Sequence, residues 1–202
     1  DLHSFPTRRS SDLDLWDVER GAPNKIMERP WQCCNCIGDW HYNTGVYERN
    51  DYKNAHTIAK LLVDIVSKNG NMLLSVPLRA DGTPDEKELA IMKEFGAWMK
   101  INSESIVKTR PWKIFGEGPI ANANIKINDQ GFNDGQYIKA GADEIRFNQT
   151  EKYLYITPLA WPKNHQVTIK ALAEGSEHFA SPIKSVELLV YGKVKFQRTQ
   201  DA

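Results

Sequence analysis

Aromatic and acidic side chains gather in one polar stretch of the chain, between residues 14 and 53. The aromatic residues there include Trp31, Trp40, His41 and Tyr42. Aromatic side chains in polar loop sequence are typical of a cleft wall, although an aromatic core cluster has the same composition. Glu48 follows in segment 43–50, which we expect to be a loop because Gly45 allows the chain to bend. We therefore look for chemistry in this stretch.

Three cysteines, Cys33, Cys34 and Cys36, lie within four positions. The first and last have C-x-x-C spacing, but no second pair or nearby His completes a structural zinc site. Since no distant cysteine exists, a scaffold of several disulfides is excluded. We expect these residues to be small side chains in or beside a buried strand rather than metal ligands.

The charges of the chain balance. Its 202 residues include 26 Lys and Arg and 26 Asp and Glu, which gives a formal net charge of zero. This balance argues against a polybasic nucleic-acid binder and against an acidic, disordered tail. No window approaches the roughly 18 apolar residues of a membrane span. A globular chain with one full domain or two small ones is expected.

Helix, strand and helix patterns follow one another between residues 58 and 102. The first helix has one apolar face, formed by Ile58, Leu61, Leu62, Ile65 and Val66. Asn69-Gly70 offers a left-handed end to this helix. Residues 71–76 are a near-continuous apolar run, which predicts a strand buried on both faces.

The second helix has its own start signal. Thr83 is the predicted cap, Pro84 fits the first turn and Glu86 completes a capping box. The residues that this helix should bury are Leu89, Met92, Phe95 and Met99, and it should end near residue 102. Helix, buried strand and helix in this order are typical of a parallel α/β sheet or a (β/α) barrel.

The pattern changes near residue 113. Gly, Asn and Asp dominate residues 116–143, and short alternating segments follow. The predicted strands cover 145–148, 154–156, 167–169, 186–190 and 194–196. Short strands separated by turn signals predict an antiparallel β-sandwich. We expect an α/β domain over residues 14–112 and an all-β domain over residues 113–202.

The first thirteen residues stand apart from this scheme. Residues 3–13 closely resemble the translation of a common short-read sequencing adaptor. We therefore interpret residues 1–13 as an assembly artefact, expect them to be disordered and exclude them from reasoning about the fold.

Several motifs appear together in a familiar order. They are Glu19-Arg20-Gly21, Pro30-Trp31-Gln32, Ile37-Gly38-Asp39-Trp40-His41-Tyr42-Asn43, Ser67-Lys68-Asn69-Gly70-Asn71, Asp81-Gly82-Thr83 and Arg110-Pro111-Trp112. In this order the chain resembles the α-L-fucosidases of glycoside hydrolase family 29 over roughly residues 14–118.

The resemblance implies the C-terminal part of a catalytic (β/α) barrel followed by a β-sandwich. It implies a retaining hydrolase that removes terminal α-L-fucose from an oligosaccharide or glycoconjugate, with two carboxyl groups and no metal or organic cofactor. The family nucleophile is an Asp on a strand before residue 19, which we expect to be missing from this chain, so that the chain alone would be inactive. A catalytically degenerate, carbohydrate-binding relative is the alternative.

The resemblance also suggests roles for single residues. Arg20 matches an arginine beside the active centre, and a surface ion pair with Glu19 is the alternative. Gln32 stands where many relatives have Glu. Since an amide cannot act as a general acid at neutral pH, Gln32 is expected at most to bind substrate.

Another carboxyl group must then supply the proton. Glu48 is our candidate, because a subgroup of the family carries its acid on a mobile loop after this strand; a surface glutamate paired with Arg49 is the alternative. Asp39 is the next candidate, unless it forms a turn with its own backbone. Trp40 and His41 are candidates for a sugar platform, whereas for Trp31 a packing role alone is an equal interpretation.

Overall fold

The computed structural model describes residues 15–123 and 132–202. Residues 1–13, which we interpreted as an artefact, lie outside the described residues.

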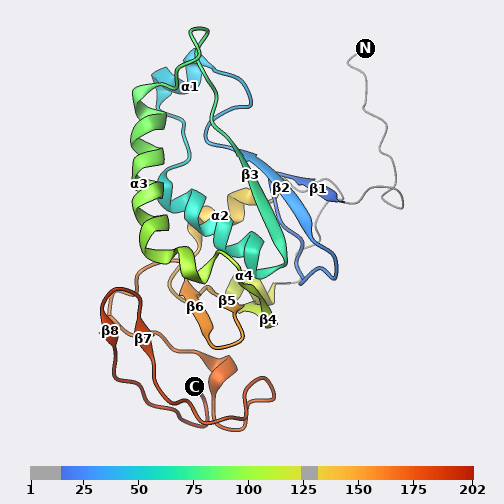
Figure 1. The fold of residues 1–202 in the computed structure, drawn as a ribbon, viewed down its shortest axis with the longest axis vertical. Helices are drawn as coiled ribbons and strands as arrows, with labels where there is room; N and C mark the ends of the chain where they lie inside the picture. Colours follow the sequence, from blue (N-terminus) through green and yellow to red (C-terminus); the bar gives the residue numbers. More distant parts are fainter. Residues whose placement is uncertain (1–14, 124–131) are drawn as a thin grey trace.

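A three-stranded parallel sheet forms the first part of the fold (Figure 1). Its strands are β1 (Trp16–Glu19), β2 (Trp31–Cys36) and β3 (Gly70–Ser75), in the order β1-β2-β3. Parallel neighbours need a crossover connection, and between β2 and β3 this contains α1 (Thr44–Arg49) and α2 (Ala55–Ser67). The α/β character of this half is therefore confirmed.

Helix α2 packs on one face of this sheet. Ile58, Leu61 and Ile65 are buried, as their helical spacing predicted. Asn69 takes the left-handed conformation, with a φ of 68°, and ends the helical segment as expected.

A close contact between β2 and β3 completes this face. Trp31 is fully buried, and its indole N–H donates to the Lys68 carbonyl at 2.9 Å. Gly70 lies opposite Trp31 in the strand register, where a Cβ atom would collide with the indole ring. Only glycine fits at this position, and Trp31 belongs to the core.

The opposite side, which we call the open face, consists of Asp17, Gln32, Cys34, Asn71 and Leu73. Asp17 accepts hydrogen bonds from the Gln32 amide and the Cys34 thiol on the neighbouring strand. Leu73 is 56% exposed. The prediction that residues 71–76 are buried on both faces is therefore wrong, because α2 covers only one side of the sheet.

Helix α3 (Glu86–Asn102) follows β3, but it begins two residues later than predicted. Its N-cap is Asp85, which forms a capping box with Glu88. Thr83 does not cap the helix, since its N–H and hydroxyl groups both donate to Asp81 in the preceding turn. Because Thr83 bonds to Asp81, Asp85 takes the N-cap position and the helix starts after it.

The apolar face of α3 is only partly covered. Leu89 is 43% exposed, contrary to prediction, while Met92, Phe95 and Met99 are half-buried. Figure 1 shows why: α3 packs on α2, which lies between α3 and the parallel sheet. The short η1 (Ser103–Ser105) ends this part of the chain. Among the residues described, no helix has the length and apolar character to cross a bilayer.

A three-stranded antiparallel sheet forms the second part of the fold. Its strands are β4 (Arg110–Glu117), β5 (Ile145–Gln149) and β6 (Leu154–Pro158), in the order β4-β5-β6. The latter two were predicted; β4 was not, and the expected domain boundary near residue 113 falls inside it. Between β4 and β5 lie α4 (Pro119–Asn122) and η2 (Asp134–Lys139).

The C-terminal segment contains less regular structure than the alternating pattern predicted. Residues 167–169 form no strand, and η3 (Lys170–Leu172) follows them. The strand predicted over residues 186–190 is shortened to β7 (Glu187–Leu188), and residues 194–196 form no strand, because β7 pairs with β8 (Gly192–Lys193) in a hairpin just before them. Antiparallel structure is confirmed here, but the described residues show one three-stranded sheet and this hairpin rather than two large sheets.

A buried network of charges joins the two parts. Asp64 on α2 lies 2.7 Å from Lys68 Nζ and 2.5 Å from Arg146 Nε on β5. Arg146 Nη1 also lies 2.9 Å from Glu144. All four side chains are at most 2% exposed. Because such charges are stable only when paired, α2 and β5 must keep this arrangement.

Candidate active site

The carboxyl ends of the three parallel strands meet at one edge of the sheet. Arg20 directly follows β1, and residues 37–41 directly follow β2. In parallel α/β folds the loops at this edge carry the functional groups. The sequence candidates can therefore be compared by their distance from it.

Arg20 is held at this edge by its backbone and its side chain. Its backbone N–H donates to the Cys34 carbonyl at 2.8 Å, and its φ of 50° lies in the left-handed region. Its Nε lies 3.4 Å from Asp134 Oδ2, and Lys53 Nζ lies 3.5 Å from the same oxygen. The alternative ion pair of Arg20 with Glu19 is not found among the described residues, since Arg20 pairs with Asp134 instead. With 40% of its side chain exposed, Arg20 keeps donors available to a ligand.

Asp39 forms a turn. Its Oδ1 accepts the Trp40 N–H at 2.7 Å, and its Oδ2 accepts from the Asn43 amide at 3.0 Å. These two hydrogen bonds, with smaller contributions from the charges of His41 and Arg20, hold the pKa of Asp39 below its ordinary value. A carboxyl group that stays ionised is a poor proton donor, so the turn interpretation of Asp39 is the one the structure supports.

The aromatic residues of this stretch separate into two groups. Trp31 is in the core, where its ring centroid lies 6.3 Å from that of Trp16. Trp40 is 37% exposed and His41 is exposed, both in the loop after β2. Only the second group can meet a ligand at the carboxyl edge.

Glu48 lies on a short helix rather than in a loop, because segment 43–50 contains α1. Asn43 caps this helix by accepting from the Gly45 N–H at 2.9 Å. The Glu48 carboxyl group is exposed, and within residues 15–123 and 132–202 it makes no ion pair with Arg49.

Helix α1 is fixed to the start of α3, beside which it lies in Figure 1. The Tyr47 hydroxyl donates to Glu86, and the Lys87 ammonium donates to the Tyr47 carbonyl at 2.5 Å. The Tyr52 hydroxyl donates to Asp85 at 2.6 Å. These contacts give the helix that carries Glu48 a defined position.

Gln32 lies at the other end of its strand. It is the second residue of β2, four residues before the strand ends at Cys36, or about 13 Å at the rise of an extended chain. Its amide donates to Asp17 on β1 at 3.2 Å. The structure therefore does not bring Gln32 together with Arg20, Trp40 and His41.

The cysteines belong to β2, as expected. Cys33 is buried on the α2 side, whereas Cys34 lies on the open face beside Asp17. Burial raises the pKa of Cys33 to about 11, and burial together with the Asp17 hydrogen bond raises that of Cys34 to about 12. In the part of the chain that is described, no group of His, Cys, Asp and Glu side chains is arranged to hold a metal ion.

Two residues of this site were not found from the sequence. Lys53 and Asp134 form the charged cluster with Arg20, and Lys53 also donates to the Cys36 carbonyl at 3.0 Å. Asp134 comes from the Gly-, Asn- and Asp-rich segment whose composition indicates only loops. No local signal marks it, since its partner is 114 positions away.

Comparison with known proteins places these motifs in a family. The family model described as α-L-fucosidase matches residues 6–104. An α-L-fucosidase of Dictyostelium discoideum is 38% identical over 93 residues, which is 46% of this chain and 20% of the relative. Residues 6–104 of the chain match the α-L-fucosidase family. It spans about a fifth of the length of the curated relatives it matches.

Solved α-L-fucosidases share the fold. Isoenzyme 1 from Paenibacillus thiaminolyticus superimposes with a TM-score of 0.63 at 25% identity, over 91% of this chain and 37% of that one. A Thermotoga maritima α-fucosidase in complex with fucose superimposes with a TM-score of 0.52 at 23% identity, over 70% and 28% of the two chains. The first alignment extends beyond the family-model match and includes most of the antiparallel part.

Proposed function

We propose that this chain acts in the hydrolysis of terminal α-L-fucosyl residues from glycans. The family match over residues 6–104 is the observation that carries the proposal. The similar Thermotoga maritima enzyme has been solved with fucose, which favours a fucosylated oligosaccharide or glycoconjugate as the substrate class.

The architecture that fits this function is the C-terminal part of a (β/α) barrel followed by a β-sandwich. The parallel strands β1 to β3, with α2 and α3 outside them, correspond to the last units of such a barrel. In this arrangement the open face, with Asp17 and Leu73, turns toward the barrel interior. The β4-β5-β6 sheet corresponds to one layer of the sandwich.

Three residues at the carboxyl edge form the substrate-binding part of the proposed site. Arg20 donates hydrogen bonds to sugar hydroxyls or orients a carboxylate, since Asp134 fixes its Nε while the rest of the side chain reaches solvent. Trp40 offers an aromatic face to the C–H groups of a pyranose ring. His41 donates a hydrogen bond to a sugar hydroxyl or accepts one from it.

Glu48 supplies the proton in this proposal. A retaining glycosidase needs one carboxylate that attacks the anomeric carbon and one carboxyl group that protonates the leaving oxygen. Glu48 is carried by α1, which follows the loop of Trp40 and His41 in the chain, and the hydrogen bonds of Tyr47 and Tyr52 to Glu86 and Asp85 hold this segment against α3. Gln32 is left out of this site, since it lies near the amino end of β2 and bonds to Asp17.

The activity is tested with the open reading frame extended upstream of residue 14. The purified protein is expected to release p-nitrophenol from the aryl α-L-fucoside. Proton NMR of the first product should show the α-anomer, as retention requires. Binding of fucose without any release would instead support the degenerate carbohydrate-binding alternative.

The role of Glu48 needs its own variants. In the extended enzyme, Glu48→Gln should lower turnover of natural glycans by about 100-fold or more, the scale of one general acid–base group. Glu151→Gln, at an exposed position in a turn of the antiparallel part, is the matched control and should leave turnover unchanged. Full turnover in Glu48→Gln would remove Glu48 from the mechanism.

A further inference from the structure

Four side chains meet in the segments that follow the carboxyl ends of β2 and β3. They are Tyr42, Tyr47, Arg79 and Glu86, which we call the Arg79 cluster. Tyr42 lies in the loop after β2, Tyr47 on α1, Arg79 in the loop after β3 and Glu86 at the start of α3. Figure 1 shows the connection from β3 to α3 passing beside α1. The cluster thus joins four segments, and the proposed site uses none of its members.

The guanidinium of Arg79 is held by two partners. Its Nη2 lies 2.8 Å from Oε2 of Glu86, and its central carbon lies 5.8 Å from the centroid of the Tyr42 ring. The other carboxylate oxygen of Glu86 accepts from the Tyr47 hydroxyl, so this carboxylate is fixed as well. Because ordering a free side chain costs affinity, a guanidinium that is already held is well prepared to bind a ligand.

The backbone that carries Arg79 forms a closed turn. The Arg79 N–H donates to the Thr83 carbonyl at 2.8 Å, and the Gly82 N–H donates to the Arg79 carbonyl at 2.9 Å. Gly82 has a φ of 81°, a conformation that favours glycine. Asp81 accepts from both the N–H and the hydroxyl of Thr83. The turn therefore presents Arg79 from a defined position.

Arg79 keeps donors for a ligand. An arginine has five N–H donors, the contacts with Glu86 and Tyr42 use only part of them, and the side chain is 35% exposed. The hydrogen bond from Tyr47, followed by those from the Glu86 backbone and Arg79, lowers the pKa of Glu86 to about 2. The pair is thus ionised at neutral pH and carries no net charge. Such a pair suits the hydroxyl groups of a neutral sugar better than an anion.

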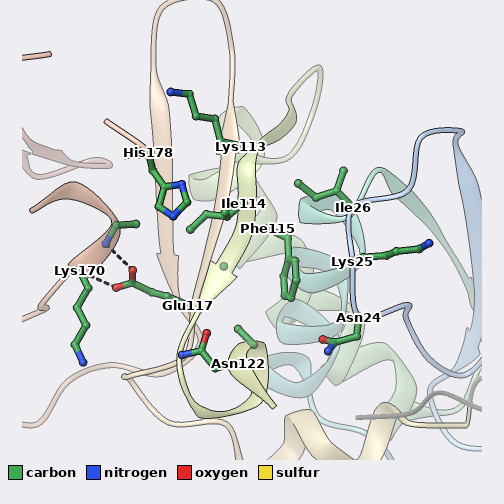
Figure 2. A pocket seen from close by; sticks show the side chains of 13 residues that line it. Asn24, Lys25, Ile26, Lys113, Ile114, Phe115, Glu117, Asn122, Lys170 and His178 are labelled. Atoms are coloured by element: carbon green, nitrogen blue, oxygen red, sulfur yellow. Dashed lines mark hydrogen bonds between the residues drawn. The ribbon is translucent and has the colours of Figure 1, made fainter. Parts of the chain in front are cut away.

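The groove in Figure 2 offers no comparable arrangement among the described residues. It lies between the connection after β1 and β4, with a volume of about 620 Å³. The side chains of Lys25, Lys113 and Lys170 point away from one another, and Glu117 accepts from the backbone N–H groups of Lys170 and Ala171. Its charged groups therefore do not converge on one ligand, unlike those of the Arg79 cluster.

We propose that Arg79 is a specificity-determining residue that binds hydroxyl groups of the sugar to which fucose is attached. This inference rests on the proposed hydrolysis and extends it to the leaving group. The general acid protonates the oxygen that joins the two sugars, so the leaving sugar lies on the side of the acid. Arg79 is tied through Glu86 and Tyr47 to α1, the helix that carries Glu48. Arg79 is therefore placed on the leaving-group side of the site.

Two substrates of the extended enzyme isolate this contact. One is a disaccharide of fucose linked to galactose, and the other is cyclohexyl α-L-fucoside. Both have an alkoxide leaving group that needs a proton and a ring of the same size, but only galactose offers hydroxyl groups. Arg79→Gln should lower the ratio of the two kcat/KM values, disaccharide over cyclohexyl fucoside, by about tenfold or more, the scale of a hydrogen bond from a charged group. A weaker loss is expected for Arg79→Lys, which keeps the charge but not the planar fork.

Arg29→Gln is the matched control, at an exposed position just before the amino end of β2, and it should keep the wild-type ratio. An unchanged ratio in Arg79→Gln, with equal losses on both substrates, would overturn the proposal, because Arg79 would then act only by holding α1. If the wild-type enzyme cleaves neither substrate, the proposed hydrolysis is wrong, and calorimetry decides about Arg79. Arg79→Gln should still weaken binding of the disaccharide more than that of cyclohexyl fucoside, and equal weakening would refute the contact.

Discussion

The Nε atom of Arg20 lies 3.4 Å from Oδ2 of Asp134, although 114 positions separate the two residues along the chain. Their backbones also meet, since the Asp134 N–H donates to the Arg20 carbonyl at 3.1 Å. Asp134 is buried, and Lys53 adds a second cation to its carboxylate. One arginine at the carboxyl edge of the parallel sheet is thus oriented by a residue from the second half of the chain.

Asp134 is therefore expected to be a positioning residue for the proposed activity. In the extended enzyme, Asp134→Asn keeps the shape of the side chain but removes the charge that holds Arg20. Because a small misplacement of a binding group is costly, kcat/KM should fall by about 10- to 100-fold. Steady-state kinetics measures this, and Asp51→Asn, at an exposed acidic position, is the control.

The two kinetic constants show whether this effect is local. Loss of an orienting contact should change kcat or KM while the melting temperature moves by only a few degrees. If Asp134→Asn merely unfolds the protein, the residual activity per folded molecule will equal that of the wild type, and the positioning role will be wrong.

The buried network between α2 and β5 should dominate the stability of the described fold. Asp64→Ala leaves the charges of Arg146 and Lys68 without their shared carboxylate, in surroundings with almost no water. Removal of one partner from such a buried pair costs about 3–5 kcal/mol. Urea unfolding should show this loss, while Asp51→Ala should change the free energy of unfolding by less than about 0.5 kcal/mol.

The same network predicts how stability depends on pH. Burial alone would raise the pKa of Asp64, but the charges of Lys68 and Arg146 prevail, so its pKa lies below the ordinary value of 3.8. The contribution of Asp64 is therefore fully present above about pH 4 and is lost as the pH falls through the lowered pKa. In thermal melts between pH 7 and pH 2, the melting temperature should fall steeply at the acid end of this range. The fall should be shallower for Asp64→Asn, and an identical pH dependence of the two proteins would contradict the assignment.

What the sequence predicted correctly rests on local spacing. Ile58, Leu61 and Ile65 face the core because the period of a helix puts them on one side, and this needs no knowledge of distant residues. The helix start at residue 83 was wrong by two positions because Asp81 competes for Thr83, a choice that depends on turn geometry. Such boundary errors are local and small.

What the sequence did not predict depends on partners far along the chain. Strand β4 was missed because its pairing residues lie beyond residue 144, and Asp134 carries no local mark of its contact with Arg20. Leu73 was expected in the core because its strand is apolar, but burial of a strand depends on what covers each face. For the candidate site, the family resemblance suggested Arg20 and the polar loop sequence suggested Trp40, whereas only the fold showed that Gln32 lies at the other end of β2.

The exposure of Leu73 leads to the last prediction. The open face presents this apolar side chain to solvent at 56% exposure, and exposed apolar patches of sheets promote association. The 202-residue chain alone is expected to associate or precipitate, and Leu73→Lys should increase the monomeric fraction in light scattering after size-exclusion chromatography. Leu78→Lys is the matched control, since Leu78 is 53% exposed but lies in the loop after β3. If Leu78→Lys increases the monomeric fraction as much, the added positive charge explains the gain rather than the loss of an apolar side chain from the open face. A wild-type chain that is already monomeric and melts cooperatively would show that the open face does not drive association.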